Sequence, residues 1–550
     1  MSLLTDRPQL PAPSRVAICR EEPRYPTAVP YGPDEAYPEL GALAADAGGP
    51  PNSAYRAVRG ALRLLGCDAD RFGSPSWNPL GAWIRPGDRV LVKPNWVMHR
   101  HPEQERLGLD VARDCLVTHP SVLRAVLDYV QLALRGEGRI VLADAPLQGC
   151  DFDALLRRSH VPELVDHFAR MRRDGAGSPP PVPVEVDDLR LEVAVERASL
   201  GGVGATFRKE LRDETRAHAI VDLDEWSALE PISAGSRAFR VTGYDPQGMA
   251  RTHRPGHHAY CVSRHVLEAD AIVNVPKLKT HKKGGITVAL KNLVGINGHK
   301  SFLPHHRQGS IADGGDEYLA EDRLKWWASR LYDKVNRRDS SPRVQRAASL
   351  AAASLAALGR LVREEGTESG CWYGNDTIWR TCLDLNRILL YADAAGAFRG
   401  QAPDASPQRR VLHLVDGIYG GDGDGPLAPR PRPSGVVLAG SSAAFVDLAA
   451  ARLMGLAWSQ IPLVREAFGK FRGAPLAASG PETLQLVSNV TAWDRVRGAD
   501  PLPEALAYQP APGWEGVLDP APDDPRVPLR VAVRRPGLLW RRASREAAVP

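Results

Sequence analysis

The chain has 550 residues, of which 43% are hydrophobic, so it can bury one large or two medium cores and does not have the composition of a disordered protein. Its formal net charge of +5 is small for this length and the basic residues form no long runs, which argues against a general nucleic-acid-binding protein. Its seven scattered cysteines form no C-x-x-C pair, which argues against a disulfide scaffold, a zinc ribbon or an iron–sulfur cluster of the ferredoxin type.

Residues 1–87 are predicted to form an N-terminal extension with one strand and one helix. The apolar run at residues 15–20 favours a strand. From residue 52 to residue 65, apolar side chains recur every three or four positions, and this spacing predicts a helix.

Residues 88–185 are predicted to form a first α/β segment. A short apolar run at 90–92 is followed by a helical pattern from residue 121 to about 135, and then by a second apolar run that ends at Asp144. A strand, a helix and a strand of these lengths are typical of a right-handed βαβ unit in a parallel sheet.

Residues 186–268 are predicted to form a mixed insertion, with strand candidates at 189–195, 217–223 and 239–242.

Residues 269–316 form a segment rich in Lys and His. Its apolar run at 271–275 predicts a third strand, after which we expect a loop over 277–281 and a short helix over 286–295.

Residues 317–400 are predicted to form a helical insertion, and residues 401–490 a C-terminal α/β segment. In the latter, the apolar run at 411–415 predicts a fourth strand, which ends at Asp416 in a glycine-rich loop. Residues 491–550 are rich in Pro and Arg and are expected to form a peripheral tail.

Three further elements are predicted, a strand at 434–440, a helix at 443–454 and a candidate edge strand at 529–533. Together the elements predict an α/β fold that has a mostly parallel sheet with helices on both faces, an inserted mixed subdomain and a helical insertion.

Polar residues follow the four main apolar runs at the point where each strand ends. They are Lys93 and Asn95, Asp144, Asn274 and Lys277, and Asp416. If these strands share one parallel sheet, the polar groups lie along one edge, where ligands bind in open α/β sheets. Asn274 is therefore a candidate substrate-binding residue.

Lysine is concentrated in one stretch of the chain. Six of the 11 lysines lie in residues 271–300, whereas arginine supplies most of the positive charge elsewhere. The loop from Lys277 to His281, with Lys279 at its centre, leads to a predicted helix start, and a helix N-terminus flanked by lysines favours the binding of phosphate or carboxylate. The alternative is a solvated basic face.

His281 and Lys291 are the candidate proton-transfer residues. His281 lies inside the lysine cluster and is the histidine most suited to acid/base chemistry or to ligand binding. Lys291 shares a helical face with Thr287, and Asn292 is its neighbour, so the three are expected to reach one pocket. A lysine that snorkels from a packed helix is the alternative for Lys291.

Four aspartates are candidate ligands of a divalent metal. Asp416, Asp422 and Asp424 lie in the glycine-rich segment, and Asp144 ends the second strand of the first α/β segment. Carboxylate oxygens suit a hard divalent cation, but solvated aspartates in a glycine turn are an equal alternative. The P-loop, the dinucleotide-binding G-x-G-x-x-G and the G-x-S-x-G motif are absent from the sequence, which disfavours kinase, Rossmann dehydrogenase and α/β-hydrolase functions.

Six motifs resemble, in order, those of the domain of unknown function 362 family. They are VLVKPN, THPSVLRAVLDYV, IVLADAP, NVPKLKTHKKGGITVALKNLVGING, VDGIYGGDGDGP and VDLAAARLMG, and they span about residues 88 to 470. The resemblance implies an α/β domain and places ten residues at motif positions: Lys93, Asn95, Thr118, His119, Lys277, Lys279, His281, Lys291, Asn292 and Asp416. A weaker likeness in general layout exists to the lactate racemase family.

We expect an enzyme that acts on a small anionic metabolite, assisted by a divalent metal if one is bound, and without an iron–sulfur cluster. The alternatives are a transition-metal enzyme of redox or racemase type, and a non-catalytic anion-binding or accessory protein. The N-terminus has no signal-like apolar run and no stretch is suited to span a bilayer, so we expect a cytoplasmic protein with neither a membrane nor a nucleic-acid partner. The sequence leaves open the reaction type, any nucleotide cofactor and the oligomeric state.

Overall fold

The computed structural model describes residues 9–101, 105–106, 113–175, 177, 179–196, 206–211, 217–319, 321–337, 341, 343–344, 347–348, 350–351, 354 and 369–518. The predicted edge strand at 529–533 lies outside these residues. No helix among those described has both the length and the apolar character needed to cross a membrane.

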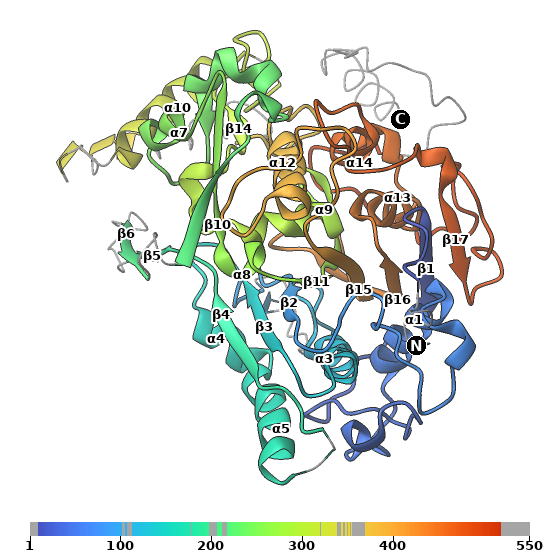
Figure 1. The fold of residues 1–550 in the computed structure, drawn as a ribbon. Helices are drawn as coiled ribbons and strands as arrows, with labels where there is room; N and C mark the ends of the chain where they lie inside the picture. Colours follow the sequence, from blue (N-terminus) through green and yellow to red (C-terminus); the bar gives the residue numbers. More distant parts are fainter. Residues whose placement is uncertain are drawn as a thin grey trace, which may run out of the picture.

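A ten-stranded mixed sheet forms the centre of the molecule (Figure 1). The main path runs β17-β1-β16-β15-β11-β2-β3-β4, and the hairpin of β12 and β13 joins it through β15. The strands are β1 (Arg15–Arg20), β2 (Arg89–Pro94), β3 (Arg139–Asp144), β4 (Val184–Asp188), β11 (Ala271–Val275), β12 (Lys277–His281), β13 (Gly285–Thr287), β15 (Arg410–Asp422), β16 (Arg430–Gly440) and β17 (Gln485–Ser488).

Five neighbouring strands, β15, β11, β2, β3 and β4, are parallel to one another. The four strands predicted from apolar runs ending on polar residues therefore do share one sheet. β16 is antiparallel to both β15 and β1, so the sheet is mixed on that side.

The two faces of the sheet pack into different cores, because successive side chains of a strand point to opposite faces. In β2, for example, Val90 and Val92 enter one core and Leu91 another. One face is covered by α1 (Ser53–Leu65), α3 (Pro120–Leu134), α4 (Phe152–Arg158) and α5 (Val161–Arg173). The other face is covered by α8 (Arg264–Leu267), α9 (Ala289–Asn292), α12 (Ile378–Tyr391), α13 (Ala443–Met454) and α14 (Pro462–Arg465). The predicted α/β class, with helices on both faces, is confirmed.

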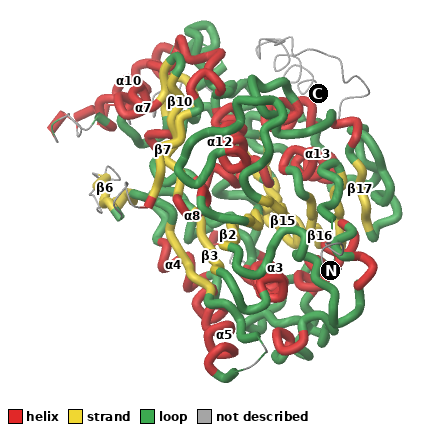
Figure 2. The backbone as a smooth tube through the Cα atoms, in the orientation of Figure 1, coloured by secondary structure: helices red, strands yellow, loops and turns green. Residues whose placement is uncertain are grey.

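Smaller β elements lie beside the main sheet (Figure 2). They are the antiparallel sheet of β7 (His218–Asp222), β10 (His257–Ser263) and β9 (His253–Arg254), the pair β8 (Phe239–Arg240) and β14 (His306–Arg307), and the pair β5 (Glu192–Glu196) and β6 (Thr206–Glu210). The remaining α-helices within the described residues are α7 (Pro246–Thr252) and α10 (Arg323–Asn336). The short 3-10 turns are η1 (Gly41–Ala44), η2 (Ala69–Arg71), η4 (Asp224–Trp226), η5 (Glu230–Ala238), η6 (Leu293–Ile296), η7 (Lys300–Phe302), η8 (Trp458–Gln460), η9 (Glu466–Phe468) and η10 (Pro481–Thr483).

Two predictions for the Lys/His segment were wrong. The predicted loop at 277–281 is strand β12, because Lys-Leu-Lys-Thr-His alternates in polarity and Leu278 packs into a core. The predicted helix at 286–295 begins as strand β13 and becomes helical only at Ala289.

The predicted start of the glycine-rich loop, directly after Asp416, was also wrong. β15 continues through the glycines as far as Asp422, because β16 pairs with it along this length. The loop begins only beyond Asp422.

Candidate functional site

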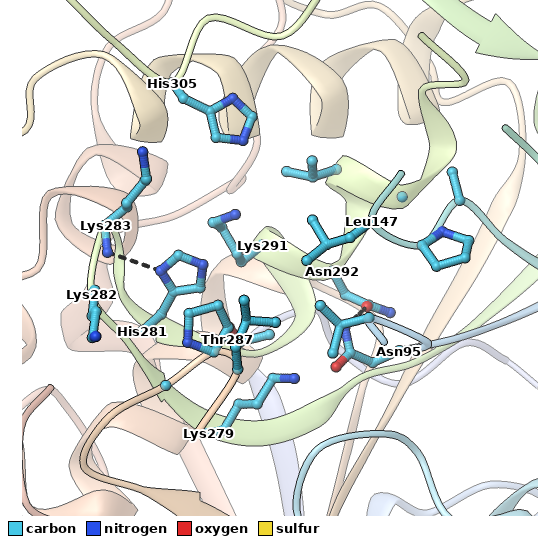
Figure 3. A pocket seen from close by; sticks show the side chains of 18 of the residues that line it. Asn95, Leu147, Lys279, His281, Lys282, Lys283, Thr287, Lys291, Asn292 and His305 are labelled. Carbon is cyan, nitrogen blue, oxygen red and sulfur yellow. Dashed lines mark hydrogen bonds between the residues drawn. The ribbon is translucent and has the colours of Figure 1, made fainter. Parts of the chain in front are cut away.

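A cavity of about 570 Å³ lies beside the carboxyl ends of the parallel strands (Figure 3). Its walls come from the segments that follow β2 and β3, from the β12–β13 hairpin, from α9 and from the loop that follows β15. The strand topology brings these segments together, as expected for a ligand site in an open α/β sheet.

Five lysines line the cavity: Lys279, Lys282, Lys283, Lys291 and Lys300. Two carboxylates also line it, and each already pairs with a lysine. Asp144 Oδ1 lies 2.7 Å from Nζ of the buried Lys93, and Asp424 pairs with Lys282. Among the described residues, the other four lysines of the lining have no ion-pair partner, so the cavity carries an excess of positive charge.

Burial and mutual repulsion shift the protonation of these lysines. Burial, together with the charges of Lys277 and Lys291, lowers the pKa of Lys279 to about 7. Burial and Lys291 lower the pKa of Lys300 to about 8, and they also lower the pKa of Lys283. A bound anion would relieve this repulsion.

Two histidines of the cavity are neutral at physiological pH. Burial, reinforced by nearby lysines, holds the pKa of His281 and that of His305 well below the usual range. The Nδ1 atom of His281 accepts a hydrogen bond of 3.0 Å from the backbone N–H of Lys283 (Figure 3). The neutral ring of His281 therefore carries its proton on Nε2 and can donate a hydrogen bond from there.

The β12–β13 hairpin positions Lys279, His281 and Thr287. It is held against the chain after β15, where Thr280 Oγ1 donates to the carbonyl of Gly423 at 2.7 Å. Gly285 begins β13 with a φ of +76°, a conformation that favours glycine.

The predicted anion site at the helix start is occupied by the protein's own carboxylate. α9 begins at Ala289, and the backbone N–H groups of Ala289 and Leu290 donate to Asp447 Oδ1 at 2.7 and 3.3 Å. Asp447 is fully buried in α13. The positive character of the cavity therefore comes from lysine side chains and not from this helix terminus.

Three asparagines form a chain of hydrogen bonds that leads away from the cavity. Asn95 Nδ2 donates to Asn292 Oδ1 at 2.8 Å, and Asn292 Nδ2 donates to Asn274 Oδ1 at 2.7 Å. Asn274 Nδ2 lies 3.0 Å from Nδ1 of the buried His413. The predicted site residues Asn95 and Asn292 thus line the cavity, and Asn274 supports them from behind.

A second polar cluster lies outside the cavity lining. Lys277 Nζ donates to Asp416 Oδ2 at 3.0 Å and to the hydroxyl of Tyr25 at 2.6 Å. The backbone N–H of His119 donates to Asp416 at 2.9 Å, and the His119 ring stacks on Tyr25. The hydroxyl of Thr118 links the backbones of two strand ends, accepting from the N–H of Asn95 and donating to the carbonyl of Val275. These four predicted site residues, Lys277, Asp416, His119 and Thr118, are buried and do not face the cavity.

The four aspartates predicted as metal ligands do not meet. Asp144 faces Lys93, Asp416 faces Lys277, Asp424 faces Lys282, and Asp422 accepts from the backbone N–H of Gln509. Within the described parts of the chain, no group of three or more His, Cys, Asp or Glu side chains has an arrangement that could hold a metal ion.

Sequence reasoning missed several residues of the lining. Lys282, Lys283 and Lys300 belong to the lysine-rich stretch, so their position in the sequence could have identified them. Gln148, His305 and Cys371 also line the cavity, but they come from loops that only the folded chain brings there.

Comparison with known proteins gives one family match. The family model described as "Domain of unknown function (DUF362)" matches residues 90–200 and 226–452, more than half of the chain.

A relative from Synechocystis sp., named thylakoid-associated protein, is 23% identical over 243 residues, which are 44% of this chain and 50% of the relative. The chain thus spans about half the length of this curated relative. A solved structure of a protein from Thermotoga maritima aligns with 11% identity and a TM-score of 0.25, over 70% of this chain and 55% of the other.

Proposed function

The chain belongs to the DUF362 family, whose description names no activity, and we propose from the cavity itself that the protein is an enzyme acting on a small anionic metabolite with carboxylate or phosphate groups. The observation that carries this proposal is the set of four cavity lysines, Lys279, Lys283, Lys291 and Lys300, that have no ion-pair partner among the described residues. Several lysines whose charges are not neutralised favour a ligand with more than one negative charge.

In this proposal Lys291 and Lys300 bind the anion, and His281 donates a hydrogen bond from Nε2. A neutral imidazole among lysines can stabilise negative charge as it develops on a substrate oxygen, because the hydrogen bond at Nδ1 keeps the proton on Nε2 and the ring is buried.

Lys279 is the proposed proton-transfer residue. Its side chain is 1% exposed, and its ammonium donates to the carbonyl of Leu116 at 2.6 Å. A pKa of about 7 lets it exchange a proton near neutral pH, as general acid–base catalysis requires.

The test is anion binding by calorimetry, with citrate and inorganic pyrophosphate as probes at constant ionic strength. Lys291→Ala and His281→Ala are each compared with Lys470→Ala, which removes an exposed lysine that is not part of the cavity lining. Each charge-assisted hydrogen bond contributes about 1.5–3 kcal/mol, so Lys291→Ala should weaken binding by roughly tenfold or more. His281→Ala should weaken it less, and Lys470→Ala should leave it unchanged.

If neither probe binds to the wild type, or if all three variants bind equally well, the proposed site is wrong. Once a substrate is found, turnover separates the enzyme from the non-catalytic alternative: a binding protein would retain its affinity and show no product. Circular dichroism of each variant controls for folding.

A further inference from the structure

The cavity has two kinds of surface. Every residue of the β12–β13 hairpin that lines it is polar, and these residues are Lys279, His281, Lys282, Lys283 and Thr287. The loops after β2 and β3 and the turn η6 add four apolar residues that are partly exposed. We call them the apolar patch: Val97, Ala145, Leu147 and Val294. In Figure 3, Leu147 lies on the side of the cavity away from Lys282 and Lys283.

Backbone hydrogen bonds hold the apolar patch together. The N–H of Leu147 donates to the carbonyl of Val97 at 3.1 Å, and the N–H of Ala145 donates to the carbonyl of Gly295 at 3.0 Å. Arg190 Nη1 donates to the carbonyl of Leu147 at 2.8 Å. The patch is therefore formed before a ligand binds, which lowers the entropy cost of binding.

The side chain of Leu147 has no place in the interior of the protein. Leu147 belongs to none of the hydrophobic cores that the described residues form, yet it lines the cavity. Val97 and Val294 pack against cores but keep part of their surface exposed. The removal of such apolar surface from water favours the binding of a ligand that can cover it.

A simple anion would use only the cationic side of the cavity. The volume of about 570 Å³ is typical of sites that enclose ligands larger than a single phosphate group. Such sites combine apolar walls, which contact the body of the ligand, with a few charged groups that orient it. The lysines and the apolar patch together fit a ligand with both kinds of group.

We propose that the substrate is an amphipathic anion, in which a carboxylate or phosphate group binds to the cavity lysines and an apolar body, such as a phenyl ring, covers the apolar patch. This inference rests on the proposed function, since it names the class of anion that the lysines bind.

The experiment compares ligands that share an anionic group and differ in their apolar body. Calorimetry on the full chain measures phenyl phosphate against methyl phosphate, and phenylsuccinate against succinate. In at least one pair, the phenyl compound should bind roughly tenfold more tightly and with a more negative heat-capacity change.

Leu147→Ser should lower this ratio by roughly threefold or more, because it removes apolar surface from the patch, while the affinity for the smaller ligand stays within about twofold. The matched control is Leu10→Ser, which changes a leucine that is 49% exposed and not part of the cavity lining. This control should keep the full ratio.

The outcomes separate the two proposals. If both members of each pair bind equally to the wild type, or if Leu147→Ser keeps the full preference, the apolar contact is refuted and the anion site stands. If none of the four ligands binds, and citrate and pyrophosphate do not bind either, the proposed function itself fails. The comparison on the wild type needs no variant, so it can refute the contact even if Leu147→Ser does not fold.

Discussion

The surroundings of Lys279 lower the pKa of its side chain. The side chain is fully buried, Lys277 and Lys291 repel its charge, and its one hydrogen bond among the described residues goes to a neutral backbone carbonyl. Its pKa of about 7 in the folded chain lies far below the ordinary value for lysine. The unfolded chain therefore binds more protons between pH 7 and the ordinary value, and Lys279 lowers the stability of the fold most when the pH is below 7.

The sign of this shift predicts the pH dependence of anion binding. An anion favours protonated Lys279, so binding should take up a proton above pH 7 and weaken roughly tenfold between pH 7 and 8.5. Calorimetry with pyrophosphate in buffers of different ionisation enthalpy measures the proton uptake. Lys279→Met should bind more weakly and lose much of the pH dependence. Binding that strengthens with pH would contradict the role given to Lys279.

The β12–β13 hairpin is the element that carries the site. Successive side chains of β12 point to opposite sides, so Leu278 packs into a core while Lys277 and Lys279 point to the other side. Gly285 allows the chain to turn back from β12 into β13. Its φ of +76° favours glycine, and a Cβ atom at this position would lie only 3.0 Å from Ile461 Cγ2. A substitution of this glycine should therefore displace the hairpin residues that line the cavity.

Gly285→Ala should destabilise the fold by about 1–2 kcal/mol and also weaken pyrophosphate binding, because the strained hairpin displaces Lys279 and His281. The matched control is Gly256→Ala, which has a φ of +69° and no atom within 4 Å of the added Cβ. The control should lose comparable stability in urea and retain its affinity. Equal affinities in the two variants would show that the hairpin does not set the geometry of the site.

At the scale of the whole molecule, the buried cluster around Asp416 joins parts of the chain that are far apart in sequence. Tyr25 comes from the N-terminal segment, His119 precedes α3, Lys277 begins β12, and Asp416 lies in β15. Both members of the Lys277–Asp416 pair are fully buried, so the removal of one charge leaves the other without compensation. None of these four residues is part of the cavity lining.

Asp416→Asn should lower the free energy of unfolding by about 3–5 kcal/mol, as breaking a buried pair does. Asp424→Asn removes a carboxylate whose pair with Lys282 is partly exposed and should cost less than about 1 kcal/mol. Urea unfolding of both variants gives the comparison. Equal losses would mean that burial does not distinguish the two pairs.

Local periodicity and composition were enough to identify the central strands, the helix at 443–454 and the concentration of lysine in 271–300. They could not decide which lysines face the cavity. Lys277 and Lys279 are two residues apart on the same side of β12, yet one pairs with Asp416 and Tyr25 while the other lines the cavity without a carboxylate partner among the described residues. Those partners lie 139 and 252 residues away from Lys277, so only tertiary packing brings them together and distinguishes a lysine that is paired with a carboxylate from one that lines the cavity.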